Sequence, residues 1–181
     1  MKLMIASDLH GSADAVEKLL TAFEQEQADQ LLLLGDLLYH GPRNELPEGY
    51  CPKKVISLLN PYAAKLLCVR GNCDAEVDQM VLQFPILADY AWVIFDGLRI
   101  FATHGHLFGE DNPPPLAPGS LLLCGHTHVP AFRFHKNFIY LNPGSVAIPK
   151  ENSGKSYLIL ENRVFTWKDV ADGTAWKTAS V

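Results

Sequence analysis

Short apolar runs alternate with amphipathic or polar segments along the first half of the chain. The runs are Lys2–Ser7, Leu31–Leu34 and Leu66–Val69. Runs of this length, bounded by polar or glycine residues, are typical of buried strands. Residues 12–27 place apolar side chains three and four positions apart, which predicts an amphipathic helix capped by Ser12 or Asp14. Pro52 suits the first turn of a second helix that ends at Leu59. This alternation predicts parallel strands joined by right-handed crossovers.

The second half of the chain has a different pattern, with short strands separated by turns. Tyr90–Phe95 and Leu98–Thr103 flank Asp96 and Gly97, which together are a strong signal for a two-residue hairpin. Further strands are expected at Leu121–Cys124, Ala131–His135, Phe138–Asn142, Ser156–Leu160 and Arg163–Lys168, with a turn at Asn162. This pattern favours an antiparallel arrangement of the second half.

Two segments of the second half fit no regular element. The proline-rich segment Asn112–Pro118 is expected to be a stiff loop, because proline interrupts both helices and strands. Residues 170–181 lack a clear pattern, which suits a flexible tail or a strand that binds a partner. We expect one domain over residues 1–181, built as a β-sandwich with helices outside.

Polar side chains follow five of the predicted strands at their carboxyl ends. In chain order they are Asp8 and His10, Asp36, Asn72, His104, and the pair His126 and His128. Ligands of open α/β sheets bind at this edge, so residues that are distant in sequence can converge there. His126 and His128 are two positions apart, and on an extended chain their imidazoles face the same side.

These seven side chains offer oxygen and imidazole donors and no thiolate. Such a set suits Mn²⁺, Fe²⁺ or Zn²⁺, and it exceeds the four ligands of a tetrahedral ion. Each motif has an ordinary structural explanation when it is taken singly. Asp8 and His10 also fit a capped turn. Asp36 also fits the end of an ordinary strand, and Asn72 also fits a turn. Taken together, they predict a pair of metal ions that share a bridging carboxylate.

The same series resembles the calcineurin-like metallophosphoesterase superfamily. Its members share the motifs that stand here as Asp8-x-His10, Gly35-Asp36, Gly71-Asn72-x-Asp74, His104 and Gly125-His126-x-His128. The later Asn142-Pro143-Gly144-Ser145 resembles a branch of small phosphodiesterases in that superfamily. The resemblance implies an α/β fold, a four-layer αββα sandwich, with its active site at the carboxyl ends of the strands.

The resemblance also implies a role for each donor. One ion would take Asp8, His10, Asp36 and His128, and the other would take Asp36, Asn72, His104 and His126. Asp36 would bridge the two ions, and a hydroxide between them would attack phosphorus, with Asp36, Asn72 and His104 at the catalytic centre. A bound divalent ion lowers the pKa of water toward about 7, so hydroxide is available at neutral pH. Mn²⁺ is the expected ion, with Zn²⁺, Fe²⁺ and Ni²⁺ as alternatives.

One position departs from the superfamily pattern. Many members carry histidine after the Gly-Asn pair, where this chain has Cys73. A neutral thiol is a weak proton donor, so we expect turnover to depend strongly on the acidity of the leaving group, unless Cys73 only fills space. Asp74, His106 and Arg70 are expected to support the ligands or contact the phosphate. His106 equally fits a solvated turn, and Arg43 lies in a glycine- and proline-rich loop whose residues suit either substrate contact or solvent.

Composition narrows the remaining functional classes. The net charge is −5 and there is no basic run, which argues against nucleic acid as the main partner. No apolar stretch has the length of a bilayer span, and the N-terminus turns polar by residue 7, so we expect no membrane association and a cytoplasmic location. The four cysteines form no CxxC pair and are expected to be reduced, mostly buried thiols. Self-association remains open.

The charge of the expected metal centre bears on the substrate. Two divalent ions, two aspartates and one hydroxide leave a net charge of about +1, which a monoanionic diester neutralises. We therefore expect hydrolysis of a small phosphodiester. One alternative is a phosphomonoesterase that uses the same site, with Arg70 or Arg43 absorbing the extra charge. Another is a scaffold like the retromer proteins, which share this fold without catalysis.

Overall fold

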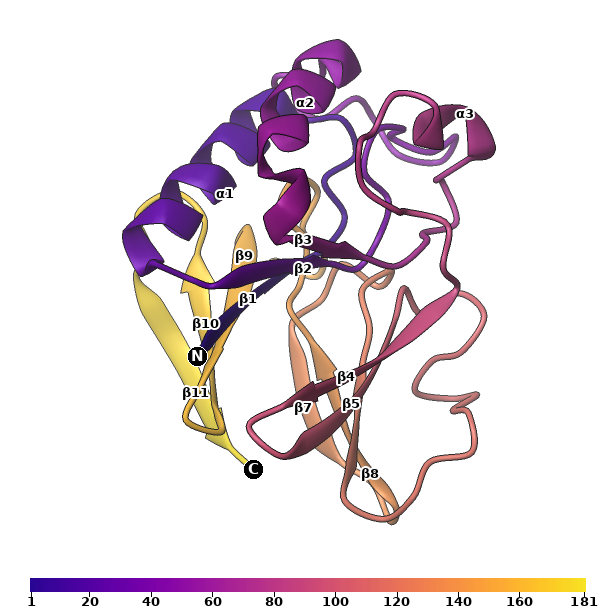
Figure 1. Cartoon of the computed structure of the whole chain (residues 1–181), viewed down its shortest axis with the longest axis vertical. Coiled ribbons are helices and arrows are strands. Elements are labelled where there is room, and N and C mark those ends of the chain that lie inside the picture. Colours follow the sequence, from indigo (N-terminus) through magenta and orange to yellow (C-terminus); the bar gives the residue numbers. More distant parts are fainter.

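Two β-sheets lie face to face, and helices cover the outer side of the first (Figure 1). The computed structural model describes all residues from Met1 to Val181. The first sheet has the strand order β11-β10-β9-β1-β2-β3. Its strands are β1 (Lys2–Ala6), β2 (Gln30–Leu33), β3 (Leu66–Cys68), β9 (Ser156–Glu161), β10 (Val164–Asp169) and β11 (Ala175–Ser180). The strands β1, β2 and β3 pair in parallel, as the alternating pattern predicted.

The helices α1 (Ala13–Glu26) and α2 (Pro52–Leu59) pack their apolar faces on this first sheet, and the 3-10 helix η1 (Asn60–Lys65) adds partly buried side chains. The short α3 (Glu76–Gln79) contributes no buried side chain. The hydroxyl of Ser12 accepts the backbone N–H of Ala15 and so caps α1, which ends where Gln27 takes a left-handed conformation. Val16 and Phe23 of α1 are buried in a cluster with residues of β1 and β2. The elements η1 and α3 are too short to leave a periodic pattern and were not predicted.

The second sheet is mixed, whereas we expected the second half to be antiparallel. Its order is β4-β5-β6-β8-β7, with β4 (Tyr90–Phe95), β5 (Leu98–Thr103), β6 (Ser120–Leu123), β7 (Ala131–Phe134) and β8 (Phe138–Asn142). The hairpin between β4 and β5 is confirmed, with Asp96 and Gly97 both at positive φ. However, β5, β6 and β8 pair in parallel. Residues 104–119 and 124–137 are long enough for the crossovers that parallel pairing requires.

The last strands return to the first sheet. β9 pairs antiparallel with β1, and a tight turn at Asn162 and Arg163, both at positive φ, leads into β10. Residues 175–180 form β11, which pairs with β10 at the edge of this sheet. The expectation of a flexible tail is therefore wrong for this segment. Its inner edge pairs with β10 and its outer edge with no strand of the chain, an arrangement that the sequence pattern did not reveal.

The core between the two sheets is formed by apolar side chains from both. It includes Ile5, Leu32, Ile100, Leu123 and Trp167, all at most 1% exposed. This shared core confirms the predicted sandwich and holds the carboxyl ends of β1, β2, β5 and β6 in a common frame.

The outer face of the second sheet is covered by an irregular segment instead of a helix. Phe108 and Leu116, from residues 104–119, pack against the outward side chains of Phe101 and Tyr140. The resemblance had implied a helical layer here. The segment contains Pro113, Pro114, Pro115 and Pro118, which exclude a helix, as the sequence indicated.

The cysteines are all free thiols, as expected, but they are less buried than predicted. Cys124 is buried, Cys68 and Cys73 are partly exposed, and Cys51 is exposed. Cys68 and Cys124 both lie in apolar runs, but only Cys124 is buried, because burial depends on which side of the chain each thiol faces. None of the helices combines the length and the apolar character that a membrane crossing requires.

Candidate metal centre

The seven predicted donors lie together at one edge of the sandwich. Segments that follow β1, β2 and β3 of the first sheet and β5 and β6 of the second deliver them. Asp8, His10, Asp36, His104 and His128 are at most 3% exposed, while Asn72 and His126 face more solvent. Side chains that follow strands of both sheets, and that are up to 120 residues apart in the chain (Asp8 to His128), thus lie close together.

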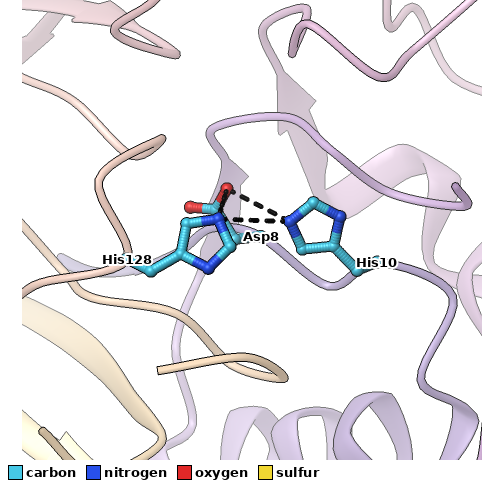
Figure 2. A group of neighbouring side chains, drawn as sticks. All are labelled: Asp8, His10 and His128. Atoms are coloured by element: carbon cyan, nitrogen blue, oxygen red, sulfur yellow. Dashed lines mark hydrogen bonds and ion pairs between the residues drawn. The ribbon is translucent and has the colours of Figure 1, made fainter. Parts of the chain in front are cut away.

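Asp8, His10 and His128 form one cluster (Figure 2). The Nε2 atoms of the two histidines are 3.3 Å apart, and they lie 3.6 Å (His10) and 3.3 Å (His128) from Oδ1 of Asp8. Oδ1 of Asp8 is buried and has no hydrogen-bond partner in the chain. A buried, unpartnered carboxylate oxygen facing two imidazoles is the arrangement that a cation would satisfy.

The opposite nitrogen of each histidine is held by a backbone carbonyl. Nδ1–H of His10 donates to the carbonyl of Tyr39 at 2.8 Å, and Nδ1–H of His128 donates to that of Ile148 at 2.6 Å. This contact fixes the tautomer and leaves the lone pair of Nε2 pointing into the cluster. The same device orients His104, whose Nδ1–H donates to the carbonyl of Leu34 at 2.7 Å.

A second cluster adjoins the first through Asp36. Oδ2 of Asp36 lies 3.5 Å from Nε2 of His104 and 3.7 Å from Nε2 of His10, so this carboxylate sits between the two groups. Nε2 of His104 is 3.1 Å from Oδ1 of Asn72 and 3.2 Å from Nδ1 of His126. The donors therefore divide into two sets that share one carboxylate, and each set can hold one divalent ion.

Most of these donors sit on strained backbone. Asp8, His10, Asp36, His126 and His128 have φ of 59°, 46°, 56°, 66° and 62°. Left-handed conformations are uncommon for residues other than glycine, and they concentrate at functional sites where the surrounding fold enforces them.

Two glycines let the loops after β2 and β3 approach each other. A Cβ on Gly71 would lie 2.1 Å from Oδ1 of Asp36, and one on Gly35 would lie 2.3 Å from the backbone nitrogen of Gly71. The close approach brings the N–H of Cys73 to Oδ1 of Asp36, at 2.8 Å. This contact leaves Oδ2 of Asp36 to face the histidines.

Asp74 was expected to support the ligands or to contact the phosphate. Its buried carboxylate instead accepts three backbone N–H groups, from Asp36, Leu37 and Gly71, at 2.8, 2.8 and 2.7 Å. It thereby ties the loop after β2 to the loop after β3. All three of its hydrogen-bond partners are backbone groups, and no histidine donates to it.

The end of β8 and the segment that follows it support the centre through hydrogen bonds. Nδ2 of Asn142 donates to the carbonyl of Gly125 at 2.7 Å, next to His126. The hydroxyl of Ser145 donates to the carbonyl of Asp8 and accepts the N–H of Ile148, at 2.9 and 2.8 Å. The sequence marked this segment only as a family feature, and its bracing role became visible through the fold.

The charges of the cluster suit a cation. Burial alone would raise the pKa of Asp8, but contacts with His10 and His128 outweigh it and hold the pKa well below its ordinary value. Burial opposes protonation of His104, yet the carboxylates of Asp36 and Asp8 raise its pKa to about 9. The raised pKa of His104 beside these two carboxylates shows that the donor cluster favours positive charge.

The same surroundings keep Cys73 neutral. Burial and the charge of Asp36 raise the pKa of its thiol to about 12. Its sulfur belongs with His10 and Asp36 to a further group of closely spaced donors. The donor set as a whole, two carboxylates, an amide oxygen and four imidazoles, fits divalent transition metal ions.

A cavity of about 330 Å³ opens over these donors. Beside ligand candidates it is lined by Cys73, Arg43, Asn44 and Lys150. Lys150 was missed at the sequence level, because it belongs to no motif and reaches the cavity only through the fold. Arg70 lines neither this cavity nor its neighbour, but its charge reaches His106, whose pKa is lowered by burial, by His104 and by Arg70.

His106 lies beside the ligands. Its ring centroid is 5.4 Å from that of His104 and 6.3 Å from that of His126. It faces an adjoining cavity of about 300 Å³, which His126 also lines. His106 therefore borders the centre without joining either set of donors.

Comparisons with known proteins agree with this geometry. The calcineurin-like phosphoesterase superfamily domain matches residues 1–163. Phosphodiesterase YfcE of Escherichia coli K12 is 52% identical over 92% of this chain and 90% of its own length. The probable metallophosphoesterase YsnB of Bacillus subtilis is 27% identical over 88% of this chain and 83% of its own.

Solved structures point the same way. The structure of YfcE, described as a phosphoesterase from E. coli, has a TM-score of 0.96 at 48% identity and covers 99% of both chains. A single mutant of Vps29 from Entamoeba histolytica has a TM-score of 0.65 at 19% identity, over 100% of this chain and 99% of its own, which shows a shared fold. On its sequence match and its fold, the chain is a member of the calcineurin-like phosphoesterase superfamily.

Proposed function

We propose that this protein is a metal-dependent phosphodiesterase that hydrolyses a small phosphodiester at the carboxyl edge of its two sheets. The observation that carries the proposal is the convergence of histidine lone pairs on buried carboxylates, with the other ring nitrogen of His10, His104 and His128 held by a carbonyl. The proposal also draws on the 52% identity to a curated phosphodiesterase.

Two sets of residues would each hold one metal ion. Asp8, His10, Asp36 and His128 would hold one divalent ion. Asp36, Asn72, His104 and His126 would hold the other, with Asp36 shared. When bound, two such ions supply a hydroxide nucleophile at neutral pH and neutralise charge on the phosphoryl oxygens.

Asn72 and His126, the more exposed donors, line the cavity where the phosphoryl group would sit. Attack on phosphorus breaks the bond to the leaving oxygen, which yields a phosphomonoester and an alcohol. Cys73, with a pKa near 12, stays protonated and is a weak proton donor, so the leaving oxygen departs without strong acid assistance.

We propose Mn²⁺ as the working ion, because carboxylate, amide and imidazole donors suit it. Zn²⁺, Fe²⁺ and Ni²⁺ are the alternatives, and the availability of each ion in the cell decides among them. The cytoplasmic location and the absence of a nucleic acid or membrane partner, expected from the sequence, stay predictions. The same holds for self-association.

The test is turnover by metal-stripped protein. Bis(p-nitrophenyl) phosphate and p-nitrophenyl phosphate are assayed in parallel, with Mn²⁺, Zn²⁺, Ni²⁺ or Mg²⁺ added singly. We expect metal-restored hydrolysis of the diester well above that of the monoester. Faster monoester hydrolysis would replace the proposal with a phosphatase, and the absence of turnover with every ion would favour a scaffold role.

A further inference from the structure

Two basic side chains border the cavity over the metal centre and have no acidic partner. Arg43 enters from the loop after Asp36, and Lys150 enters from the segment after β8. The ion pairs of the chain involve other lysines and arginines. The backbone N–H of Lys150 donates to the carbonyl of His128 at 3.3 Å, so this lysine is anchored next to a metal-ligand candidate.

The cavity on the other side of His126 has no lysine or arginine in its lining. Its carboxylates are those of Asp111 and Glu110, and Glu110 is already paired with Arg133 and His135. His126 is the residue that both cavities share. A diester bound with its phosphorus at the metal centre would therefore meet an arginine and a lysine on one side and neither on the other.

The charge of the bound diester leaves these two cations unmatched. A diester carries one negative charge, which neutralises the net charge of about +1 expected for the loaded centre. In a chain whose net charge is −5, two unpaired cations at one cavity leave a local charge that favours an anion. A terminal phosphoryl group carries about −1.5 to −2 at neutral pH, which matches Arg43 and Lys150 together.

The chemistry of the two side chains also suits phosphate. A guanidinium offers a planar fork of donors that binds two phosphoryl oxygens at once, and an ammonium adds a compact charge. The side chain of Asn44, which also lines this cavity, is oriented by one N–H of its Nδ2, which donates to the carbonyl of His40 at 2.8 Å. The cavity volume of about 330 Å³ lies at the lower end of small-molecule sites, so the bound substituent is small.

We propose that the substrate is a phosphodiester with a second, terminal phosphoryl group on one substituent, and that Arg43 and Lys150 bind this group. The phosphorylated substituent lies on the side of Cys73, and the other substituent faces Glu110 and Asp111. This inference rests on the proposed function and names the substrate class of the same site.

A pair of chromogenic substrates tests the proposal. Thymidine 5′-(p-nitrophenyl phosphate) is compared with the same compound carrying a 3′-phosphate, so that the leaving group is identical. We expect kcat/KM of the Mn²⁺-loaded protein to be at least about tenfold higher for the 3′-phosphorylated compound. This preference should weaken as ionic strength rises, because the two side chains are exposed.

Substitutions test whether Arg43 and Lys150 cause the preference for the 3′-phosphorylated substrate. Arg43→Gln and Lys150→Gln should each reduce the ratio of the two kcat/KM values, and the double variant should bring it close to one. Lys136→Gln is the matched control, because Lys136 is exposed in the turn between β7 and β8 and lines neither cavity. A ratio near one in the unaltered protein, or a preference that survives in the double variant, would overturn the inference.

A binding measurement separates this inference from the proposed activity. Thymidine 3′,5′-bisphosphate and thymidine 5′-monophosphate are titrated calorimetrically into the Mn²⁺-loaded protein. We expect the bisphosphate to bind at least about tenfold more tightly, with the difference lost in the double variant. If no ion restores turnover, the proposed function fails, and this comparison alone decides whether the basic pair binds phosphate. Equal affinities would refute the basic pair as a phosphate site.

Discussion

The carboxylate of Asp74 accepts the backbone N–H of Asp36 at 2.8 Å, so one aspartate positions another. The same carboxylate also accepts N–H groups of Leu37 and Gly71. Asp36 sits between the two donor clusters in a left-handed conformation, which is uncommon for residues other than glycine and which this contact helps to hold. The clamp therefore links the loop after β3 to the geometry of the shared carboxylate.

Replacing Asp74 with Asn should weaken both the fold and the metal centre. The amide offers one acceptor where two oxygens now accept three N–H groups, and its NH₂ would face another donor. Buried donors left unsatisfied cost about 1–3 kcal/mol, so we expect a loss of that size in the free energy of unfolding. Metal affinity should fall about 10- to 100-fold.

Urea denaturation and metal titration followed by calorimetry measure the two effects of Asp74→Asn. Glu76→Gln is the control, because Glu76 is an exposed residue in the first turn of α3. Unchanged metal affinity in Asp74→Asn would show that the clamp does not hold the centre.

Replacing Asp36 with Asn should nearly abolish turnover. The amide keeps the shape of the side chain but removes the charge that the two ions would share, so we expect metal content to fall and activity to drop by more than about 10³-fold. Inductively coupled plasma mass spectrometry gives the metal content, and circular dichroism checks the fold. Asp89→Asn, an exposed carboxylate, is the control. Full activity in Asp36→Asn would rule out the bridging role.

Replacing Cys73 with His should change how turnover depends on the leaving group. The thiol, with its pKa near 12, gives little acid assistance, whereas an imidazole titrates near neutral pH. We expect faster hydrolysis of diesters with poor leaving groups and a shallower slope of log kcat/KM against leaving-group pKa. Cys73→Ala removes the thiol without adding a donor and should keep the steep slope. Equal slopes for the histidine variant and the unaltered protein would contradict the argument.

The stability of the metal-free protein should fall as pH rises from about 6.5 to 9. His104 has a pKa raised to about 9 by Asp36 and Asp8 against the effect of burial, so its protonated form stabilises the folded state. This contribution is complete below the unfolded pKa of 6.5 and is lost as pH passes through the folded pKa, with a size on the order of 3 kcal/mol.

Metal loading should remove this dependence, because the ion takes the place of the proton on the histidine. Urea denaturation of metal-free and Mn²⁺-loaded protein at pH 6 and pH 9 measures both trends. The His104→Gln variant should lose this part of the pH effect and keep only the smaller part from His10, whose pKa Asp8 raises against the effect of burial, while His135→Gln, at an exposed position, should keep the whole effect. A metal-free protein that is equally stable at both pH values would contradict the prediction.

Much of the fold could be predicted because local physics dominates it. The apolar period of α1, its cap at Ser12 and the hairpin turn at Asp96 and Gly97 depend on neighbours within a few residues, and each was found where expected. The parallel pairing of β5, β6 and β8 was missed, because parallel pairing depends on crossovers that no local pattern records. The edge strand β11 was missed for a similar reason, since its partner β10 decides it.

The donors of the candidate site were also readable from the sequence. Residues such as Asp8 and His126 follow strands directly, and strand ends at one edge meet wherever a sheet forms. Chemistry and order together therefore predicted a two-ion centre before any contact was known. The types of donor, their number and the weak acid at Cys73 were decided by the sequence alone.

What held those donors in place was decided by the tertiary structure. The carbonyl of Ile148 that orients His128, the clamp of Asp74 on Asp36 and the hydroxyl of Ser145 behind Asp8 join segments far apart in the chain. The basic pair at the cavity arises in the same way. Such contacts carry no periodic signal, because a hydrogen bond or a cavity wall depends on where two distant segments meet and not on the residues beside either one.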